Sequence, residues 1–466
     1  MRIEEEIICE GEFWLPDSDD YRVIGKIIIN NEEAMRVDLY GFLERGNFSS
    51  ESKRYPVILG VVEKLGELTL LNSFVSVFNI SFSGVNRSKI ITNMIYSGVH
   101  LTEPEKNFFK ECRLKCDYLD EWMDTPGITV DTKYPDEKHT ISYSKPKAIS
   151  SSLEDGTIVQ IDYEYTLPGY PVLKEAGYTQ QAFIKIIPIK SMELSYFTSF
   201  AAKLSNFITL SLPDNGLSEI TSFSCIMGNK ESKNSICVNV FYKSLSSVNK
   251  RKINANDMLF KYKNIAASFN CILNKWINSY TQIESAIQLY FSYIAGRQTL
   301  IEARFLTLAQ SLEILHRNTT SEKYIDEGKY DELVNTLIEN CPETHRKWLM
   351  GRLLTGNELS LNNRLINLFM PFHEHLGGKR GVEKIARKTT ATRNYLTHYS
   401  PLSKREAVNG EALVKLIFVL EIVILFHLYT IAGLNNENFH RLLTETANPL
   451  KMKLGYALSK TEKKKV

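Results

Sequence analysis

The sequence predicts an α+β protein: a β-rich N-terminal domain, sandwich or barrel-like with a few helices, followed by an all-α helical bundle. Up to about residue 250, apolar and polar residues alternate with a period of two, which is typical of strands. From about residue 256 the apolar residues recur every three or four positions, and 257–295 contains no proline. We therefore expect domains at 1–255 and 256–450 and a basic, disordered tail at 451–466.

The clearest strand signal in the N-terminal half is the alternation of Met35, Val37 and Leu39 with charged residues. A hairpin is expected where two apolar runs flank Glu63–Gly66. Two helices, over 105–123 and 192–210, and a polar surface excursion over 124–147 complete this half.

The C-terminal half is expected to consist of long helices separated by glycine and proline. Their spacing of apolar residues suits a bundle in which each helix turns one face to a common core. The expected helices are 257–295, 299–317, 329–340, 343–354, 360–375, 380–399 and 403–433.

The segment 416–433 is almost entirely apolar and raises the question of a membrane span. Glu421 and His427 interrupt it, and a charge at mid-span costs a few kcal/mol. We therefore expect a helix buried in a core or at a subunit interface, and no membrane.

Composition excludes several classes of protein. The formal net charge of +2 leaves no global excess of basic residues, so a nucleic-acid site must be a local patch. Seven cysteines in 466 residues do not indicate a disulfide framework. The chain opens on acidic residues, unlike a signal peptide, so we expect a cytoplasmic protein. The pattern G-x-x-x-x-G-K-[ST] is absent from the sequence, which argues against an ATPase or GTPase.

The most informative segment is Ala391–Pro401, which contains Arg393, Asn394 and His398. On a helix Asn394 and His398 lie within about 40° of each other, whereas Arg393 lies about 140° from His398. One straight helix therefore does not bring all three together. His398 is expected at the helix C-terminus, because Pro401 disfavours helical geometry just before it. That position favours an imidazolium, which can donate a proton.

A histidine and an arginine suffice for RNA cleavage without a metal or other cofactor. The ribose 2′-OH is the nucleophile and already lies next to the phosphodiester. His398 can move protons near neutral pH. The guanidinium of Arg393 can hold the charge of the phosphorane, and Asn394 can orient His398 or bind the phosphate.

The surroundings of this motif are basic, with eight basic residues and one acid, Glu383, between Gly378 and Arg405. We expect Lys384, Arg387 and Lys388 to contact RNA. Glu313 lies in an otherwise apolar helix, where an unpaired carboxylate is costly; it is expected to pair with Arg393 as a supporting carboxylate, or locally with Arg317.

Simpler interpretations stand beside these. Arg-x4-His arises by chance, and a basic helix face is often only solvated surface. Cys112 and Cys116 are four residues apart and could be half of a metal site, but buried thiols are favoured because no second ligand pair matches them. His373 and His375 do not have the four-residue spacing of a zinc helix, so we expect no metal.

Two groups of segments resemble the ApeA family. The segment Arg393-Asn-Tyr-Leu-Thr-His398 resembles the R-N-x-x-x-H motif of HEPN ribonucleases, and Arg304–Arg317 resembles the first conserved helix of the ApeA-like HEPN branch. The N-terminal half is similar to the ApeA N-terminal domain at Gly11–Pro16, 39–41, 58–60, 65–70 and 108–122.

The resemblance implies a bacterial anti-phage, abortive-infection effector with toxin-like ribonuclease activity. HEPN domains are helical bundles that pair, which implies a homodimer in which two R-x4-H motifs form one composite site. It also implies metal-independent RNA cleavage to 2′,3′-cyclic phosphate ends, with tRNA as a target, and a sensing or restraining role for the N-terminal domain toward a phage-encoded trigger protein. The alternative functions are a non-catalytic RNA- or nucleotide-binding module, and a phage-protein- or glycan-binding protein that oligomerises through its helices.

Overall fold

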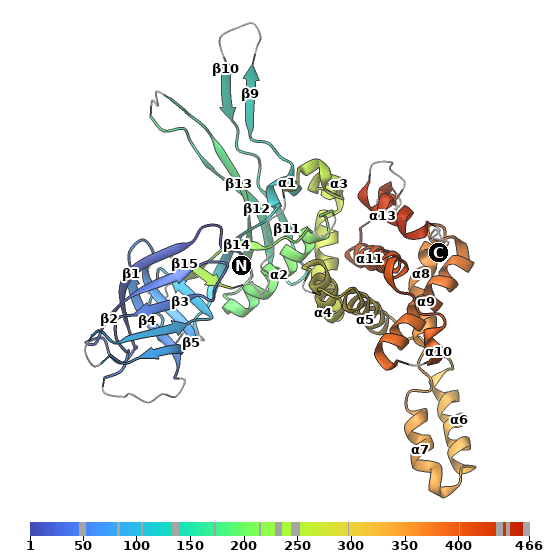
Figure 1. Ribbon diagram of the computed structural model, residues 1–466. Coiled ribbons are helices and arrows are strands. Elements are labelled where there is room, and N and C mark those ends of the chain that lie inside the picture. Colours follow the sequence, from blue (N-terminus) through green and yellow to red (C-terminus); the bar gives the residue numbers. More distant parts are fainter. Residues whose placement is uncertain are drawn as a thin grey trace, which may run out of the picture. The chain divides into compact units, whose positions relative to one another are not determined.

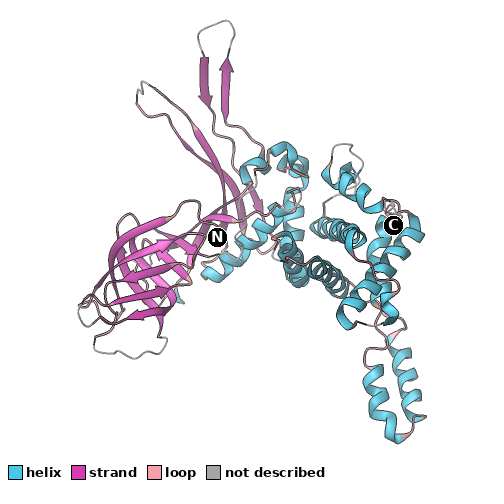
Figure 2. Ribbon diagram, viewed as in Figure 1, coloured by secondary structure: helices cyan, strands magenta, loops and turns pink. Residues whose placement is uncertain are grey.

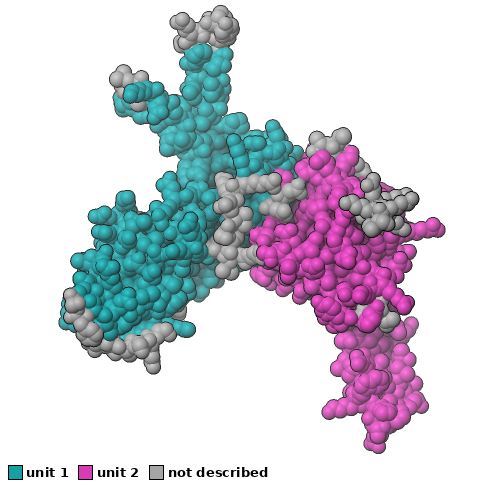
Figure 3. Space-filling model, in the orientation of Figure 1, with its two compact units in different colours: residues 1–212, 216–274 teal, residues 213–215, 275–466 magenta. Residues whose placement is uncertain are grey.

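The computed structural model describes residues 1–45, 53–81, 84–103, 106–132, 139–170, 174–213, 216–228, 235–243, 252–296, 298–399, 401–434, 441–443 and 448–459. The chain divides into two compact units, coloured separately in Figure 3. Unit 1 comprises 1–212 and 216–274, and unit 2 comprises 213–215 and 275–466. The strands lie in unit 1, and unit 2 is helical (Figure 2). The α+β class and its order along the chain are therefore confirmed.

Six strands of unit 1 close into a barrel (Figure 1). Each strand pairs antiparallel with its neighbour in the order β4–β1–β2–β3–β6, and β5 closes the ring by pairing with both β4 and β6. Closure removes free edges from this part of the sheet. The six strands are β1 (Ile7–Trp14), β2 (Val23–Ile29), β3 (Arg36–Leu39), β4 (Arg54–Val62), β5 (Gly66–Asn79) and β6 (Arg87–Ile91).

The long strand β5 also links the barrel to the rest of the sheet. Its first half pairs with β7 (Met94–Ser97) and its second half with β6. Asn72 lies at the change of partner and has a φ of 50°, a left-handed conformation that asparagine tolerates better than most residues. Thr92, between β6 and β7, donates its hydroxyl to the carbonyl of Leu71 at 3.1 Å. A bend in one strand thus lets a single sheet both close and continue.

Beyond β7 the sheet continues through antiparallel pairs in the order β15, β14, β8, β13, β12 and β11. Helix α2 (Leu194–Thr209), predicted over 192–210, packs on β8 and β14. The expected excursion over 124–147 contains a separate two-stranded hairpin of β9 (Ile128–Thr132) and β10 (His139–Tyr143). The other strands are β8 (Phe109–Cys116), β11 (Ile149–Ser152), β12 (Ile158–Thr166), β13 (Thr179–Ile187), β14 (Ile220–Gly228) and β15 (Ser235–Tyr242).

The predicted helix over 105–123 is wrong for most of its length. Residues 109–116 form β8, and only Leu119–Met123 form a helix, α1. Cys112, Leu114 and Cys116 are buried with a period of two. The charged residues between them face outward, where Arg113 and Lys115 pair with Glu164 across the sheet. Residues four apart lie on one face of a strand as well as on one face of a helix. The spacing of the two cysteines therefore could not distinguish a strand from a helix.

The helices of unit 2 follow the predicted order. The expected helix over 257–295 begins instead with short turns, η2 (Ala255–Asp257), α3 (Tyr262–Ile265) and η3 (Ala266–Ser268), before α4 (Phe269–Ile294). The unit boundary falls within α4. The expected helix over 403–433 is broken into α10 (Pro401–Lys404) and α11 (Gly410–Ala432). The others are α5 (Ile301–Thr319), α6 (Glu327–Glu339), α7 (Glu343–Leu353), α8 (Leu361–Phe369) with η4 (Met370–Phe372), α9 (Gly378–His398) and α13 (Pro449–Leu458).

Helix α11 is the core helix of this unit. Its length and composition would allow it to cross a membrane. However, 78% of its most apolar 18-residue stretch is buried inside the protein. Its carboxylate, Glu421, is buried and has two partners: the Tyr293 hydroxyl donates to it at 2.8 Å, and Lys453 Nζ lies 2.7 Å away. Lys453 belongs to α13, so residues 451–458 of the expected tail are helical instead of disordered; residues 460–466 lie outside the described residues.

Candidate active site

Helix α9 carries Arg393, Asn394 and His398 in its last two turns. It ends at His398, as Pro401 predicted, and Tyr399 follows with a φ of 49° while its N–H donates to the Tyr395 carbonyl at 2.7 Å. The buried face of the helix consists of Val382, Ala386, Thr389 and Thr392. This face fixes the rotation of α9, and therefore the directions in which the three polar side chains point.

Arg393 points toward α5. Its Nη2 lies 3.3 Å from Glu313 Oε2, and its Nη1 donates to Asn394 Oδ1 at 3.2 Å. Both side chains of the ion pair are partly exposed, so the pair orients the guanidinium more than it stabilises the fold. Glu313 also contacts Arg317 at 3.3 Å. The two partners that the sequence left as alternatives for Glu313 are therefore both present.

The ion pairs continue away from Arg393 in a chain of alternating charge. Arg317 pairs with Glu358, and Glu358 lies 3.2 Å from Nη2 of the buried Arg364. Arg364 Nη1 in turn lies 3.3 Å from Nδ1 of the buried His316. Glu358 and Arg364 were not among the residues predicted from the sequence. The sequence pattern could have indicated Arg364, because it is a charged residue on the apolar face of α8 beside Leu365 and Leu368. No pattern in the sequence indicates Glu358.

His398 is exposed on a different face of α9 from Arg393. On the helical wheel Arg380, Lys384 and Arg387 lie within about 40° of His398, and Asn394 lies at the edge of the same stripe. Arg380 and Lys384 are exposed, as is Arg387, which pairs with Glu406 at 3.2 Å. Lys388 lies about 80° from the stripe and is partly buried. We call this row of Arg380, Lys384, Arg387 and His398 the basic stripe of α9.

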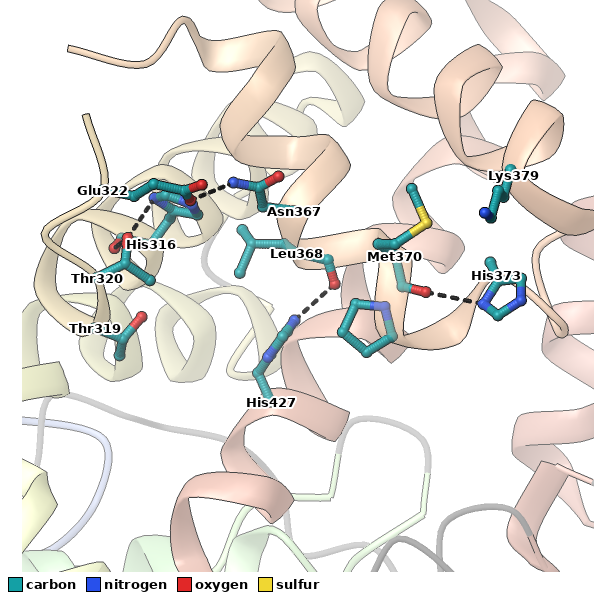
Figure 4. A pocket seen from close by; sticks show the side chains of 11 residues that line it. His316, Thr319, Thr320, Glu322, Asn367, Leu368, Met370, His373, Lys379 and His427 are labelled. Atoms are coloured by element: carbon teal, nitrogen blue, oxygen red, sulfur yellow. Dashed lines mark hydrogen bonds between the residues drawn. The ribbon is translucent and has the colours of Figure 1, made fainter. Parts of the chain in front are cut away.

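A separate pocket of about 720 Å³ lies between α5, α8, α9 and α11 (Figure 4). Neither Arg393 nor His398 lines it. His316 Nε2 is buried and has no hydrogen-bond partner among the described residues. His427 Nε2 bonds to the Leu368 carbonyl at 2.8 Å, so this nitrogen carries the proton. The pocket is lined by His316, Thr319, Thr320, Glu322, Asn367, Leu368, Met370, Pro371, His373, Lys379 and His427.

The two buried histidines of this pocket should make stability depend on pH. Burial, and then the neighbouring Arg364, lower the pKa of His316. Burial lowers the pKa of His427 as well. Below the usual histidine pKa near 6.5, the unfolded chain binds protons that the folded chain resists, so stability falls as pH falls. We expect the unfolding free energy to decline between pH 7 and 5 by up to about 1.4 kcal/mol per pH unit per histidine.

Chemical unfolding of His427→Gln measures this prediction, since glutamine can still donate to the Leu368 carbonyl but does not titrate. The variant should lose less stability than the wild type over the same range of pH. Equal slopes would show that His427 is not responsible.

The cysteine pair has the properties of buried thiols. Burial raises the pKa of Cys112 and of Cys116, which disfavours the thiolate that a metal requires.

His373 bonds to the Met370 carbonyl at 3.1 Å in the turn after α8. Within the part of the chain that the structure describes, no group of three or more His, Cys, Asp or Glu side chains could hold a metal ion.

Both halves of the chain match known protein families. Residues 8–276 match the model of ApeA N-terminal domain 1, and residues 306–438 match the model of the Apea-like HEPN domain. The second match includes Glu313, Arg393, Asn394 and His398. No curated protein and no solved structure matches the chain. Since the first match alone covers more than half of its length, the chain belongs to the ApeA family, with an ApeA N-terminal domain followed by an ApeA-like HEPN domain.

Proposed function

We propose that this protein is a metal-independent endoribonuclease of anti-phage defence whose active site is completed by a second copy of the chain. Its HEPN domain indicates a nuclease-like or RNA-related role in ApeA-type defence, because domains of this family are generally ribonucleases. The observation that carries the composite site is the divergence of Arg393 and His398: the first is held against α5 by Glu313, and the second is exposed on another face of α9.

In the proposed site, Arg393 of one copy and His398 of the other meet at one phosphodiester. The 2′-oxygen attacks the adjacent phosphorus, the bond to the 5′-oxygen breaks, and a 2′,3′-cyclic phosphate and a 5′-hydroxyl result. His398 moves the proton, either from the 2′-OH or to the leaving oxygen. Arg393 stabilises the charge on the phosphorane, and Asn394 binds the phosphate or orients the site. Glu313 acts as a positioning residue that aims the guanidinium.

The basic stripe of α9, with Lys388 beside it, supplies the RNA contacts in this proposal. Lys384 is the more available cation, because Arg387 is already paired with Glu406. We expect Lys384→Ala to weaken RNA binding and to lower the slope of log affinity against log salt by about 0.7, the value for one phosphate contact on a single strand. Arg387→Ala should lower it less. Fluorescence-anisotropy titrations of a single-stranded RNA at several salt concentrations measure the slopes, and equal slopes in all three proteins would contradict these contacts.

The target, trigger and location belong to the same proposal. We infer tRNA as the substrate, a phage-encoded protein as the trigger, and the cytoplasm as the site of action. The β-rich unit would sense the trigger or restrain the nuclease.

The test is induction of the wild type and of His398→Ala in bacterial cells, followed by sequencing of RNA 5′ ends. New 5′-hydroxyl ends confined to the wild type would support the proposal and identify the target. Equal RNA integrity, growth and phage plating in the two strains would leave only a non-catalytic binding module. Loss of activity of the purified protein in EDTA would contradict metal independence.

A further inference from the structure

Helices α6 and α7 form a hairpin that extends from the other helices of unit 2 (Figure 1). The two helices pack on each other, and the Tyr330 hydroxyl donates to the Leu353 carbonyl at 2.7 Å. No residue of α6 or α7, both of which the structure describes in full, is buried. Isolated helices of this length are marginal in water, since most helical stability comes from packing an apolar face. The hairpin therefore lacks the burial that normally stabilises such an element.

Several large apolar side chains of the hairpin are exposed. Trp348 is 64% exposed and Leu354, just after α7, is 80% exposed. Leu333 and Leu337 are one turn apart on α6 and are also exposed, as is Met350. Exposed apolar side chains gathered on one small element indicate a protein-interaction surface.

The charges of the two helices are complementary to each other. Helix α6 carries four acidic residues and one basic residue, and α7 carries one acidic and three basic residues. In a two-fold symmetric pair, each copy offers the same surface to the other. Two hairpins related in this way can place the acidic α6 of one copy against the basic α7 of its partner, twice. A nucleic-acid partner fits less well, because α6 would repel it.

We propose that the α6–α7 hairpin is a docking arm for the hairpin of a second copy of this chain. The exposed apolar side chains supply the buried area, and the opposite charges of α6 and α7 set the pairing. The surface is self-complementary, so it favours a closed dimer over an open chain of copies.

The base of the hairpin is linked to the candidate active site. The Asn357 side chain bonds twice to the backbone of Ile325, at 2.8 Å each, and ties the two ends of the hairpin together. The next residue, Glu358, pairs with Arg317, which shares Glu313 with Arg393. A shift of Glu358 when the hairpins dock would therefore change the position of the Arg393 guanidinium, because a continuous chain of ion pairs joins the two residues. This coupling, unlike the docking itself, rests on the proposed function.

Charge reversal tests the docking. One full-length variant carries Asp331→Lys and Glu332→Lys on α6, and a second carries Arg346→Glu and Lys347→Glu on α7; all four positions are exposed. In each variant the facing helices have like charge. We expect the wild type to have twice the chain mass of 53.4 kDa in analytical ultracentrifugation, each variant to have the chain mass, and an equal mixture of the two variants to regain the doubled mass. A chain with all four substitutions should dimerise by itself, which controls for misfolding.

Three results would overturn the proposal: a monomeric wild type, a variant that stays as dimeric as the wild type, or a mixture of monomeric variants that fails to pair. Loss of binding to a single-stranded RNA by the α7 variant, without a change in mass, would assign the arm to RNA instead. The readout is independent of catalysis, since His398→Ala should keep the doubled mass. A dimer that cleaves no RNA would contradict the proposed function alone.

Discussion

His398→Ala should lower RNA cleavage by about 10²–10⁴-fold, the usual contribution of a positioned proton-transfer group. Arg393→Ala should cause a comparable loss, because the phosphorane would lose its cation. The composite site makes a sharper prediction for a mixture of the two inactive variants. In a mixed dimer one of the two Arg393–His398 pairs is intact, so activity should return. When copies exchange freely, half of the dimers are mixed and each has one of its two sites intact, so the activity should reach about a quarter of the wild-type rate.

A gel assay on purified protein with a labelled RNA measures this recovery. The control is the double variant Arg393→Ala/His398→Ala mixed with wild type, which forms mixed dimers without any intact pair across copies. A mixture of the single variants that stays as inactive as either one would show that both residues act within one chain, and would remove the reason for a composite site.

Lys453→Met should destabilise the helical unit strongly. It removes the cation from Glu421, which is buried in α11, and leaves an uncompensated carboxylate in an apolar core. Breaking a buried ion pair from one side costs about 3–5 kcal/mol. The double variant Lys453→Met/Glu421→Gln should recover most of this loss, because the amide is neutral and still accepts the hydrogen bond from Tyr293.

Thermal and chemical unfolding of the three proteins checks the prediction. Lys329→Met, which removes a lysine from the exposed helix α6, is the matched control and should change stability by less than about 0.5 kcal/mol. If Lys453→Met is no less stable than that control, the ion pair does not hold α13 on α11, and the burial of Glu421 needs another explanation.

Much of the fold was predictable because it depends on local periodicity. The alternation at Met35, Val37 and Leu39 marks β3 and its flank, and the three- to four-residue spacing after residue 256 locates α5 to α9 within a few residues. Local patterns failed where two periods coincide. Cys112 and Cys116 fit one face of a helix or of a strand, and only the pairing of β8 with β13 and β14 decides between them. Closure of the barrel depends on β5 pairing with β6 and lies outside any local pattern.

For the candidate site, the sequence by itself determined the residue types, the place of His398 at a helix end, and the 140° that separates it from Arg393. Those follow from the helical repeat and from Pro401. Only the tertiary structure decided which way each side chain points, because the rotation of α9 is set by the packing of Val382, Ala386 and Thr389 against its neighbours. Only it placed Glu358 against Arg317, and so linked Arg393 through Glu313 and Arg317 to the base of the α6–α7 hairpin, since no sequence spacing encodes the contact of Glu358 with α5.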